Sequence, residues 1–370
     1  MRRVPELDGL RALAVAAVIA FHYTLNTRFA NPVARLGWMG VDLFFVLSGF
    51  LITGILLRAK AGPAYFRTFY LRRTLRIFPV YFLLLATYAI AARVGGGPQP
   101  WSYWAMHAAF LSSTAEYFHF WSFAAPTFVY GGVTVLWTLS IEEQFYLLWA
   151  PIVRFMRERM LARFLAVIIV AAPVLRFWIH TAAAREYRFF PARLDSLAWG
   201  AALALGMAHC AADPDRLLRA CRWLAAAAVV ALAALLAITG GRRESLWFAT
   251  FGYSAAAAAF AALVGWTVMR SRSDAWACRL LRLRPARYIG KVSYTLYLVH
   301  YPIVMLLASR IGHWGSLSAS LLVAAASWQW LEAPLLRYKD RVMPVAAGGV
   351  EFSEPPGRGL RTVEVMARGD

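Results

Sequence analysis

Charge is scarce in this sequence, and negative charge is the scarcer kind. Of its 370 residues only 16 % are charged, 39 Lys and Arg stand against 19 Asp and Glu, and 61 % are hydrophobic. Soluble globular domains carry about 25 % charged residues, so this composition excludes that class. The net charge of +20 does not indicate nucleic acid as a partner, because the basic residues lie between apolar runs rather than in one patch.

Signatures of several other classes are also missing. The three cysteines, Cys210, Cys221 and Cys278, form no close pair in the sequence, which argues against a disulfide framework and is typical of thiols in a reducing compartment. The sequence contains no HExxH zinc motif, Walker loop, dinucleotide-binding glycine motif or Gly-x-Ser-x-Gly turn. We therefore expect no metal site and no nucleotide hydrolysis.

Long apolar runs dominate what is present. Runs of about 17–25 residues are long enough to cross a bilayer as helices, and the sequence predicts ten of them, at residues 10–26, 37–57, 77–92, 131–153, 164–181, 194–210, 223–240, 246–269, 288–309 and 316–335. With the N-terminus inside, the cytoplasmic segments hold 27 Lys and Arg and the outer segments hold 9, so the positive-inside rule puts both termini in the cytoplasm. We expect an all-α, multi-pass protein of the cytoplasmic (inner) membrane, with one membrane domain over residues 1–342.

Two segments outside these spans have their own composition. Residues 343–370 are rich in Gly, Pro and charge and have little to bury, so they are predicted to be a disordered cytoplasmic tail. The longest outer loop, residues 93–130, is rich in Trp and Tyr, which indicates an interfacial, partly re-entrant segment. Its aromatic residues fit a plain interfacial belt and a carbohydrate-stacking surface equally well.

The first span contains two residues that hydrocarbon disfavours, Arg11 and His22. A charged or titratable side chain inside a membrane is costly unless it has a partner, so it marks a functional site. Eleven residues of helix bring the two side chains to within about 20° of one face and separate them by about 16 Å along the axis. This spacing favours a long ligand whose charged end is held at Arg11 and whose reacting end lies at His22.

Asp42 lies at the start of the second span, in the same depth band as His22. A buried carboxylate there is expected to orient His22, fix its tautomer and raise its basicity. The alternative is that Asp42 only caps its helix. Ser48 is expected to pack with Gly49, since small residues let helices approach closely.

Three arginines, Arg72, Arg73 and Arg76, cluster at the cytoplasmic end of the third span. In a helix, residues three and four apart are neighbours, so the three guanidinium groups can clamp a phosphate together. The alternative for such a triplet is contact with lipid phosphates.

The fourth span carries adjacent carboxylates, Glu142 and Glu143, near the middle of the membrane. At about 100° apart on a helix they cannot both face one partner. We expect structural ion pairing and the lining of a polar tunnel, with Arg176 as a partner.

The ninth span repeats the arrangement of the first, with Lys291 near its cytoplasmic end and His300 nine residues deeper. Lys291 can also extend to the interface, and His300 can simply bond a neighbouring helix. Glu332 near the end of the last span is a further isolated carboxylate. We expect a tunnel with Arg11, Arg73, Arg76 and Lys291 at its inner end and His22 at the other.

Taken together, these segments resemble the membrane acyltransferase-3 family. The resemblance rests on six segments in family order, namely Leu7–Ala12 with His22 eleven residues after Arg11, Gly40–Phe50, Tyr70–Pro79, Trp137–Phe145, Val292–His300 and Glu332–Pro334. It implies a ten-helix enzyme of the inner membrane that moves an acyl group, usually acetyl, from cytoplasmic acetyl-CoA or another acyl-CoA to a hydroxyl of a carbohydrate or related acceptor. His22 is then the essential catalytic histidine, and Arg11, Arg73 and Arg76 hold the donor. Asp42, Glu142 and Glu332 are implied to matter, in less defined roles.

The chemistry of the residues agrees with that resemblance. Arginines at the cytoplasmic end can hold the phosphates of CoA, and the pantetheine arm has a length comparable to the rise from Arg11 to His22. His22 then acts as general base on the acceptor hydroxyl, or attacks the thioester and forms an acyl-imidazole. The alternative is a transporter or exporter in which buried Arg, His and Glu form a proton or substrate pathway.

Overall fold

The computed structural model describes residues 4–24, 31–95, 99–117, 132–183, 186–210, 213–271 and 273–342. The tail predicted at 343–370 and most of the second half of the loop at 93–130 lie outside the described residues. Over the described ranges the chain is helical and has no strand, as the sequence predicts. Its elements are α1 (Pro5–Thr24), α2 (Pro32–Arg35), η1 (Gly37–Met39), α3 (Gly40–Ala59), α4 (Tyr65–Val94), α5 (Trp101–Ala108), α6 (Ser112–Tyr117), α8 (Trp137–Phe155), α9 (Glu158–Ala183), η2 (Glu186–Arg188), α10 (Phe190–His209), α11 (Pro214–Thr239), η3 (Phe248–Gly252), α12 (Tyr253–Met269), α13 (Trp276–Arg282), α14 (Arg284–Ser327), η4 (Trp328–Glu332) and α15 (Ala333–Val342).

Seven helical segments among the described residues are long and apolar enough to cross a membrane, namely Pro5–Thr24, Val33–Ala59, Tyr65–Val94, Glu158–Ala182, Pro214–Thr239, Phe248–Met269 and Arg284–Tyr338. Two other helices coincide with predicted spans but are more polar. Helix α8 carries Glu142, Glu143 and Arg154, and α10 carries Arg193 and Asp195. These charges lower the mean hydropathy of α8 and α10, and the ninth and tenth predicted spans lie in the single segment Arg284–Tyr338, so ten predicted spans correspond to seven segments.

The longest helix, α14, contains the ninth predicted span and most of the tenth. Gly312 interrupts it with φ 71° and ψ 175°, a left-handed φ that a residue with a side chain rarely adopts. The chain then folds back, because the hydroxyls of Thr295 and Ser327 lie 3.1 Å apart although 32 residues separate them. The sequence predicted this pair of antiparallel helices as two separate spans.

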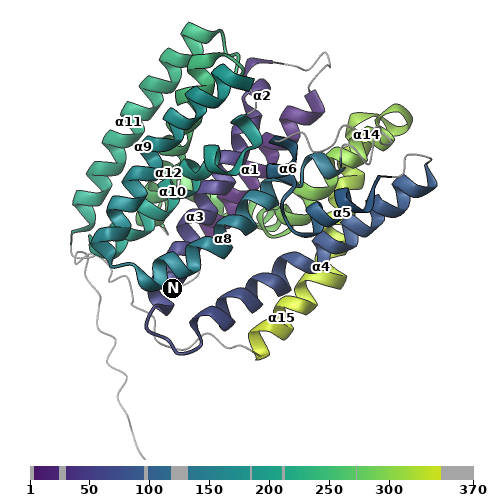
Figure 1. The fold of residues 1–370 in the computed structure, drawn as a ribbon, viewed down its shortest axis with the longest axis horizontal. Coiled ribbons are helices and arrows are strands. Elements are labelled where there is room, and N and C mark those ends of the chain that lie inside the picture. The colour runs from purple at the N-terminus through teal and green to yellow at the C-terminus, as the bar shows by residue number, and fades with distance from the viewer. Residues whose placement is uncertain are drawn as a thin grey trace, which may run out of the picture.

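Helices α1, α3 and α8 lie in the middle of the molecule. Figure 1 shows α9, α10, α11 and α12 on one side of them, and α4, α14 and α15 on the other. Helices α3 and α10 cross closely, because a Cβ on Gly49 would lie 2.0 Å from the Leu197 carbonyl oxygen, and one on Gly200 would lie 2.0 Å from that of Val46. Gly49 therefore permits the close helix approach that the sequence predicts for small residues in this segment.

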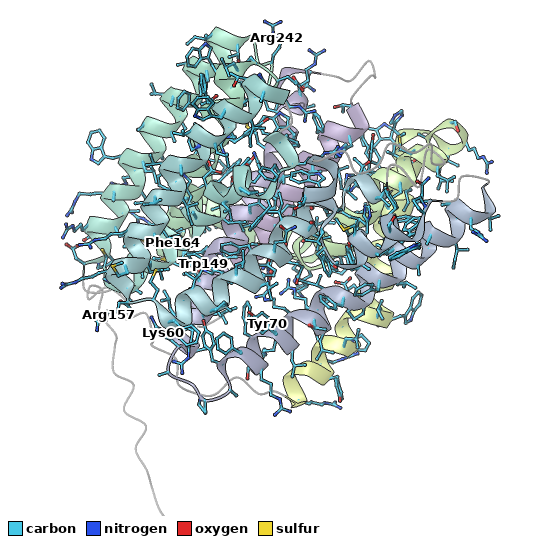
Figure 2. The ribbon with its side chains drawn as sticks, viewed as in Figure 1. Lys60, Tyr70, Trp149, Arg157, Phe164 and Arg242 are labelled. Atoms are coloured by element: carbon cyan, nitrogen blue, oxygen red, sulfur yellow. The ribbon has the colours of Figure 1, made fainter. Side chains whose placement is uncertain are left out.

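The two ends of the bundle carry different loops. In Figure 2, Lys60 and Arg157 lie at one end and Arg242 lies at the opposite end. The Lys60 ammonium donates to the Met156 carbonyl at 2.6 Å, and Arg154 donates to the Lys60 carbonyl. These contacts join the α3–α4 and α8–α9 loops, both of which the sequence assigns to one side of the membrane.

Candidate active site

His22 lies in the last turn of α1 and is in direct contact with His300 of α14. The Nδ1 atom of His22 and the Nε2 atom of His300 are 3.0 Å apart. The ring of Tyr301 lies against His22, with centroids 4.5 Å apart. The sequence placed both histidines in one depth band without pairing them. The structure shows that the two rings form a hydrogen-bonded pair.

His300 is fixed from several directions. Its side chain is fully buried, and its Nδ1 atom lies 2.6 Å from the carbonyl oxygen of Tyr297. Its own carbonyl accepts a hydrogen bond from the Tyr23 hydroxyl at 3.2 Å, and that hydroxyl also contacts Ser320 at 3.0 Å. Because Tyr23 is on α1 and Ser320 lies beyond Gly312, three helical segments hold this histidine in place.

Asp42 does not orient His22, so that expectation is wrong. Its Oδ1 atom accepts hydrogen bonds from Arg193 at 2.5 Å and from the Ser196 hydroxyl at 2.9 Å. Both side chains of the ion pair are fully buried. The guanidinium of Arg193 also lies over the ring of Tyr253, 4.5 Å from its centroid. A buried carboxylate requires a close counter-charge, and α10 supplies it.

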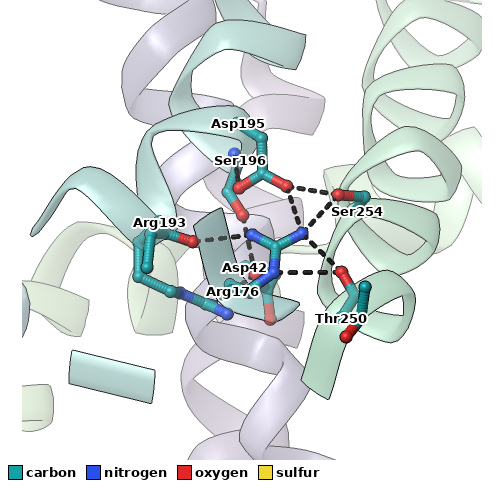
Figure 3. Close-up of polar contacts among 8 residues, drawn as sticks. Asp42, Arg176, Arg193, Asp195, Ser196, Thr250 and Ser254 are labelled. Carbon is teal, nitrogen blue, oxygen red and sulfur yellow. Dashed lines mark hydrogen bonds and ion pairs between the residues drawn. The ribbon is translucent and has the colours of Figure 1, made fainter. Parts of the chain in front are cut away.

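Arg176 does not pair with the glutamates of α8, so that expectation is also wrong. It forms a fully buried ion pair with Asp195 at 2.9 Å. Figure 3 shows the polar contacts that surround it: the Thr250 carbonyl accepts at 3.0 and 3.1 Å, the Ala192 carbonyl at 2.6 Å, and the Ser254 hydroxyl lies 2.6 Å away. Arg193 and Asp195 were not among the site residues predicted from the sequence. The sequence offered one signal for them, namely two opposite charges two residues apart at the edge of an apolar run.

Basic side chains of α1 and α4 lie near one another toward the other end of α1, as predicted. Arg11 donates to Asp8 at 3.2 Å and lies within electrostatic range of Arg73 and Arg76. Arg73 in turn lies over the ring of Tyr146, 5.4 Å from its centroid. Arg72 is half-buried on the same helix. Cations this close repel one another, so the arrangement favours an anion between them.

A pocket adjoins this basic cluster. Arg76 of α4, Lys291 and Tyr294 of α14, and Glu332 of η4 line it together with apolar side chains. Its lining includes neither Arg11 nor His22, so it is not by itself the tunnel that the sequence predicts. Glu332 is held in place by the hydroxyls of Thr295 at 2.7 Å and Ser327 at 3.3 Å.

The glutamates of α8 face the basic cluster. Glu142 accepts a hydrogen bond from the Ser48 hydroxyl at 2.5 Å, and Ser48 accepts one from the Tyr146 hydroxyl at 3.1 Å. Glu142 and Glu143 both lie within electrostatic range of Arg73. Ser48 therefore does more than pack, and the cation that acts electrostatically on both glutamates is Arg73 rather than Arg176.

The described part of the outer loop folds in against α8. Helices α5 and α6 are joined by a turn at Phe110, which has a left-handed φ of 56°. The Phe110 carbonyl accepts from the Ser140 hydroxyl at 2.5 Å and from the Gln144 amide at 2.8 Å. Because Ser140 and Gln144 flank Glu142 along α8, the loop reaches the depth of the glutamates. The prediction of a partly re-entrant loop agrees with these contacts.

Known proteins with similar sequences indicate the family to which this chain belongs. The chain is 28 % identical over 361 residues to the peptidoglycan O-acetyltransferase OatA of Listeria monocytogenes, covering 90 % of this chain and 56 % of that protein. It is 30 % identical over 362 residues to a putative peptidoglycan O-acetyltransferase, YrhL, of Bacillus subtilis, covering 90 % of this chain and 55 % of that protein. An O-acetyltransferase OatA of Staphylococcus aureus is 28 % identical over 343 residues, covering 83 % of this chain and 52 % of that protein.

The chain thus spans about half the length of the curated relatives it matches. No solved structure matches it. Among the described residues, no group of three or more His, Cys, Asp or Glu side chains could hold a metal ion. A sequence model of the acyltransferase domain matches residues 4–331, almost the whole extent of the described helices. The chain therefore belongs to this family of membrane acyltransferases, as its six sequence segments indicated.

Proposed function

We propose that this protein is a membrane O-acyltransferase that moves an acetyl group from a cytoplasmic acyl-CoA to a hydroxyl of a carbohydrate. One observation carries the proposal: a single helix, α1, joins a cluster of arginines at one end to a pair of hydrogen-bonded histidines at the other. The relatives named as peptidoglycan O-acetyltransferases favour a cell-wall glycan as acceptor.

The basic cluster suits the donor. CoA carries several phosphate charges, and guanidinium groups bind phosphate through charge-assisted, forked hydrogen bonds. Arg11, Arg73 and Arg76 repel one another in the free protein, so an anion between them relieves that repulsion. Arg72 and Lys291 extend the basic surface along α4 and into the adjoining pocket.

The histidine pair suits the chemical step. Eleven residues of α1 separate Arg11 from His22, a rise of about 16 Å, which an extended pantetheine arm can span. At His22 the thioester meets an imidazole nitrogen. As general base this nitrogen takes the proton of the acceptor hydroxyl, whose oxygen attacks the acyl carbon; the C–S bond breaks and CoA leaves as a thiol with that proton. As nucleophile the nitrogen itself attacks the acyl carbon and displaces the CoA thiolate, and the acceptor hydroxyl then takes the acyl group from the imidazole and gives its proton to the thiolate. Both roles need the same unprotonated ring nitrogen facing the reacting group.

Family membership and this division of charge favour acyl transfer over transport. A proton or substrate pathway in a transporter needs ionisable groups along its length. Here the strongly paired buried charges, Asp42 with Arg193 and Arg176 with Asp195, lie on helices α3, α9 and α10 and bond one another rather than the histidine pair. We therefore assign them to the stability of the bundle.

Removing one arginine of the cluster should weaken donor binding. For Arg11→Ala and for Arg76→Ala we expect the dissociation constant of CoA to rise by about 10–100-fold, the equivalent of one lost charge-assisted hydrogen bond of about 1.5–3 kcal/mol. Isothermal titration of the purified protein with CoA measures this. Arg219→Ala, an exposed arginine on α11, is the matched control and should bind CoA like the parent. Unchanged affinity in both cluster variants would place the donor site elsewhere.

The sidedness follows from the loops. We propose ten spans with both termini in the cytoplasm of a bacterial cell bounded by an inner membrane. In a background whose three cysteines are replaced, Arg242→Cys should react with a membrane-impermeant maleimide in intact cells. Arg157→Cys should react only after permeabilisation, because the two residues lie at opposite ends of the bundle (Figure 2). Labelling of Arg157→Cys in intact cells would invert the topology and the proposed donor side.

A further inference from the structure

We propose that His300 fixes the tautomer of His22, so that Nε2 of His22 is its reactive nitrogen. His300 is then a positioning residue, and the proposal rests on the proposed function of His22. Two successive hydrogen bonds point to it. Nδ1 of His22 lies 3.0 Å from Nε2 of His300, and Nδ1 of His300 lies 2.6 Å from the Tyr297 carbonyl oxygen.

The Tyr297 carbonyl determines which atom donates in each of these two hydrogen bonds. A carbonyl oxygen only accepts hydrogen bonds, so the ring nitrogen that contacts it must carry a proton. Nδ1 of His300 is therefore protonated. The His300 ring is fully buried, and its partners among the described residues include no carboxylate, so the ring is uncharged, since an unpaired buried charge is prohibitively costly. An uncharged imidazole with its proton on Nδ1 has a bare Nε2.

The second hydrogen bond then has only one direction. A bare Nε2 on His300 must accept, so Nδ1 of His22 donates and carries the proton of that ring. The lone pair of His22 is left on Nε2. Both the base and the nucleophile role of His22 use this lone pair.

The fold holds the chain of bonds in place. Tyr297 and His300 lie on the same turn of α14, so the carbonyl that accepts from His300 does not move relative to it. Tyr23, the residue after His22, donates to the carbonyl of His300. The two histidines are therefore tied together through a side-chain and a backbone contact, and neither ring can turn without breaking one of them.

A pair of amide substitutions tests the proposal. In His300→Gln the amide oxygen reaches the place of Nε2 and can accept from His22, whereas in His300→Asn it stops short, at the place of Nδ1. We expect His300→Gln to keep kcat within about 10-fold of the parent and His300→Asn to lose about 100-fold or more, the scale of a general-base contribution. The KM for acetyl-CoA should stay unchanged in both, because the donor site is about 16 Å away. His313→Gln, an exposed histidine of the same helix, is the control.

The tautomer of His22 can be measured by NMR, without an activity assay. In protein labelled with ¹⁵N-histidine, the His22 signals, assigned by their loss in His22→Ala, should show a protonated Nδ1 and an unprotonated Nε2 in the parent and in His300→Gln. Mixed tautomers are expected in His300→Asn. A proton on Nε2 of His22 in the parent overturns the proposal, and so does equal kcat in the Gln and Asn variants. Full activity of His22→Ala would instead refute the proposed function and leave the tautomer measurement to decide this inference alone.

Discussion

His22→Ala should abolish acyl transfer while the protein stays folded and still binds CoA. The loss of a general base or nucleophile at the reacting end lowers turnover by about 10²–10⁴-fold. Arg11 and its neighbours lie about 16 Å away along α1, so the affinity for CoA should remain that of the parent. Release of free thiol from acetyl-CoA in the presence of a glycan acceptor measures turnover, and titration with CoA measures binding.

Two comparisons make this result specific. His313→Ala removes an exposed histidine at the return of α14 and should keep turnover near that of the parent. The thermal midpoint of His22→Ala should lie close to the parent's, because His22 is only half-buried and its hydrogen bonds, to His300 and to the Val18 backbone, join neutral groups. Turnover near the parental rate in a well-folded His22→Ala protein would remove His22 from the mechanism.

The helices could be predicted from the sequence because the membrane imposes a simple length rule. Apolar runs of 16 residues or more coincide with at least part of α1, α3, α4 and α9 in the structure. The length rule does not explain helices that carry buried charged residues. Helix α8 carries two glutamates. Glu142 accepts a hydrogen bond from Ser48 of α3, and Arg73 of α4 acts electrostatically on both glutamates, but no property of the run itself reveals those partners. The two halves of α14 were predicted as separate spans, but the sequence does not show that the reversal between them lies at Gly312.

The candidate site could be predicted along each helix but not across helices. The spacing of Arg11 and His22, and that of Arg73 and Arg76, follows from the pitch of one helix. The partners of those residues depend on which helices are neighbours and how each is rotated, and the apolar pattern of a buried span does not encode this. Asp42 and His22 share a depth band, yet Asp42 faces α10 and His22 faces α14. Depth alone therefore paired the wrong residues.

The pairing of Asp42 with Arg193 has a large consequence for stability. Both side chains are fully buried, and Arg193 is further enclosed by the rings of Tyr253 and Tyr187. Removing one member of such a pair leaves the other as an uncompensated buried charge, which costs about 3–5 kcal/mol. We therefore expect Asp42→Ala to lower the free energy of unfolding by about that amount, measured by denaturant titration in detergent.

The double variant separates a structural role from a catalytic one. Asp42→Ala combined with Arg193→Leu removes both charges and fills the space with apolar side chains, so it should regain much of the lost stability, since a buried ion pair contributes little beyond a well-packed apolar pair. It should also regain turnover, because Asp42 contacts Arg193 and Ser196 rather than His22. Glu244→Ala, which breaks the largely exposed pair with Arg243, should cost less than about 1 kcal/mol. If the double variant regained stability and stayed inactive, Asp42 would act in the reaction itself, as its position in the sequence had indicated.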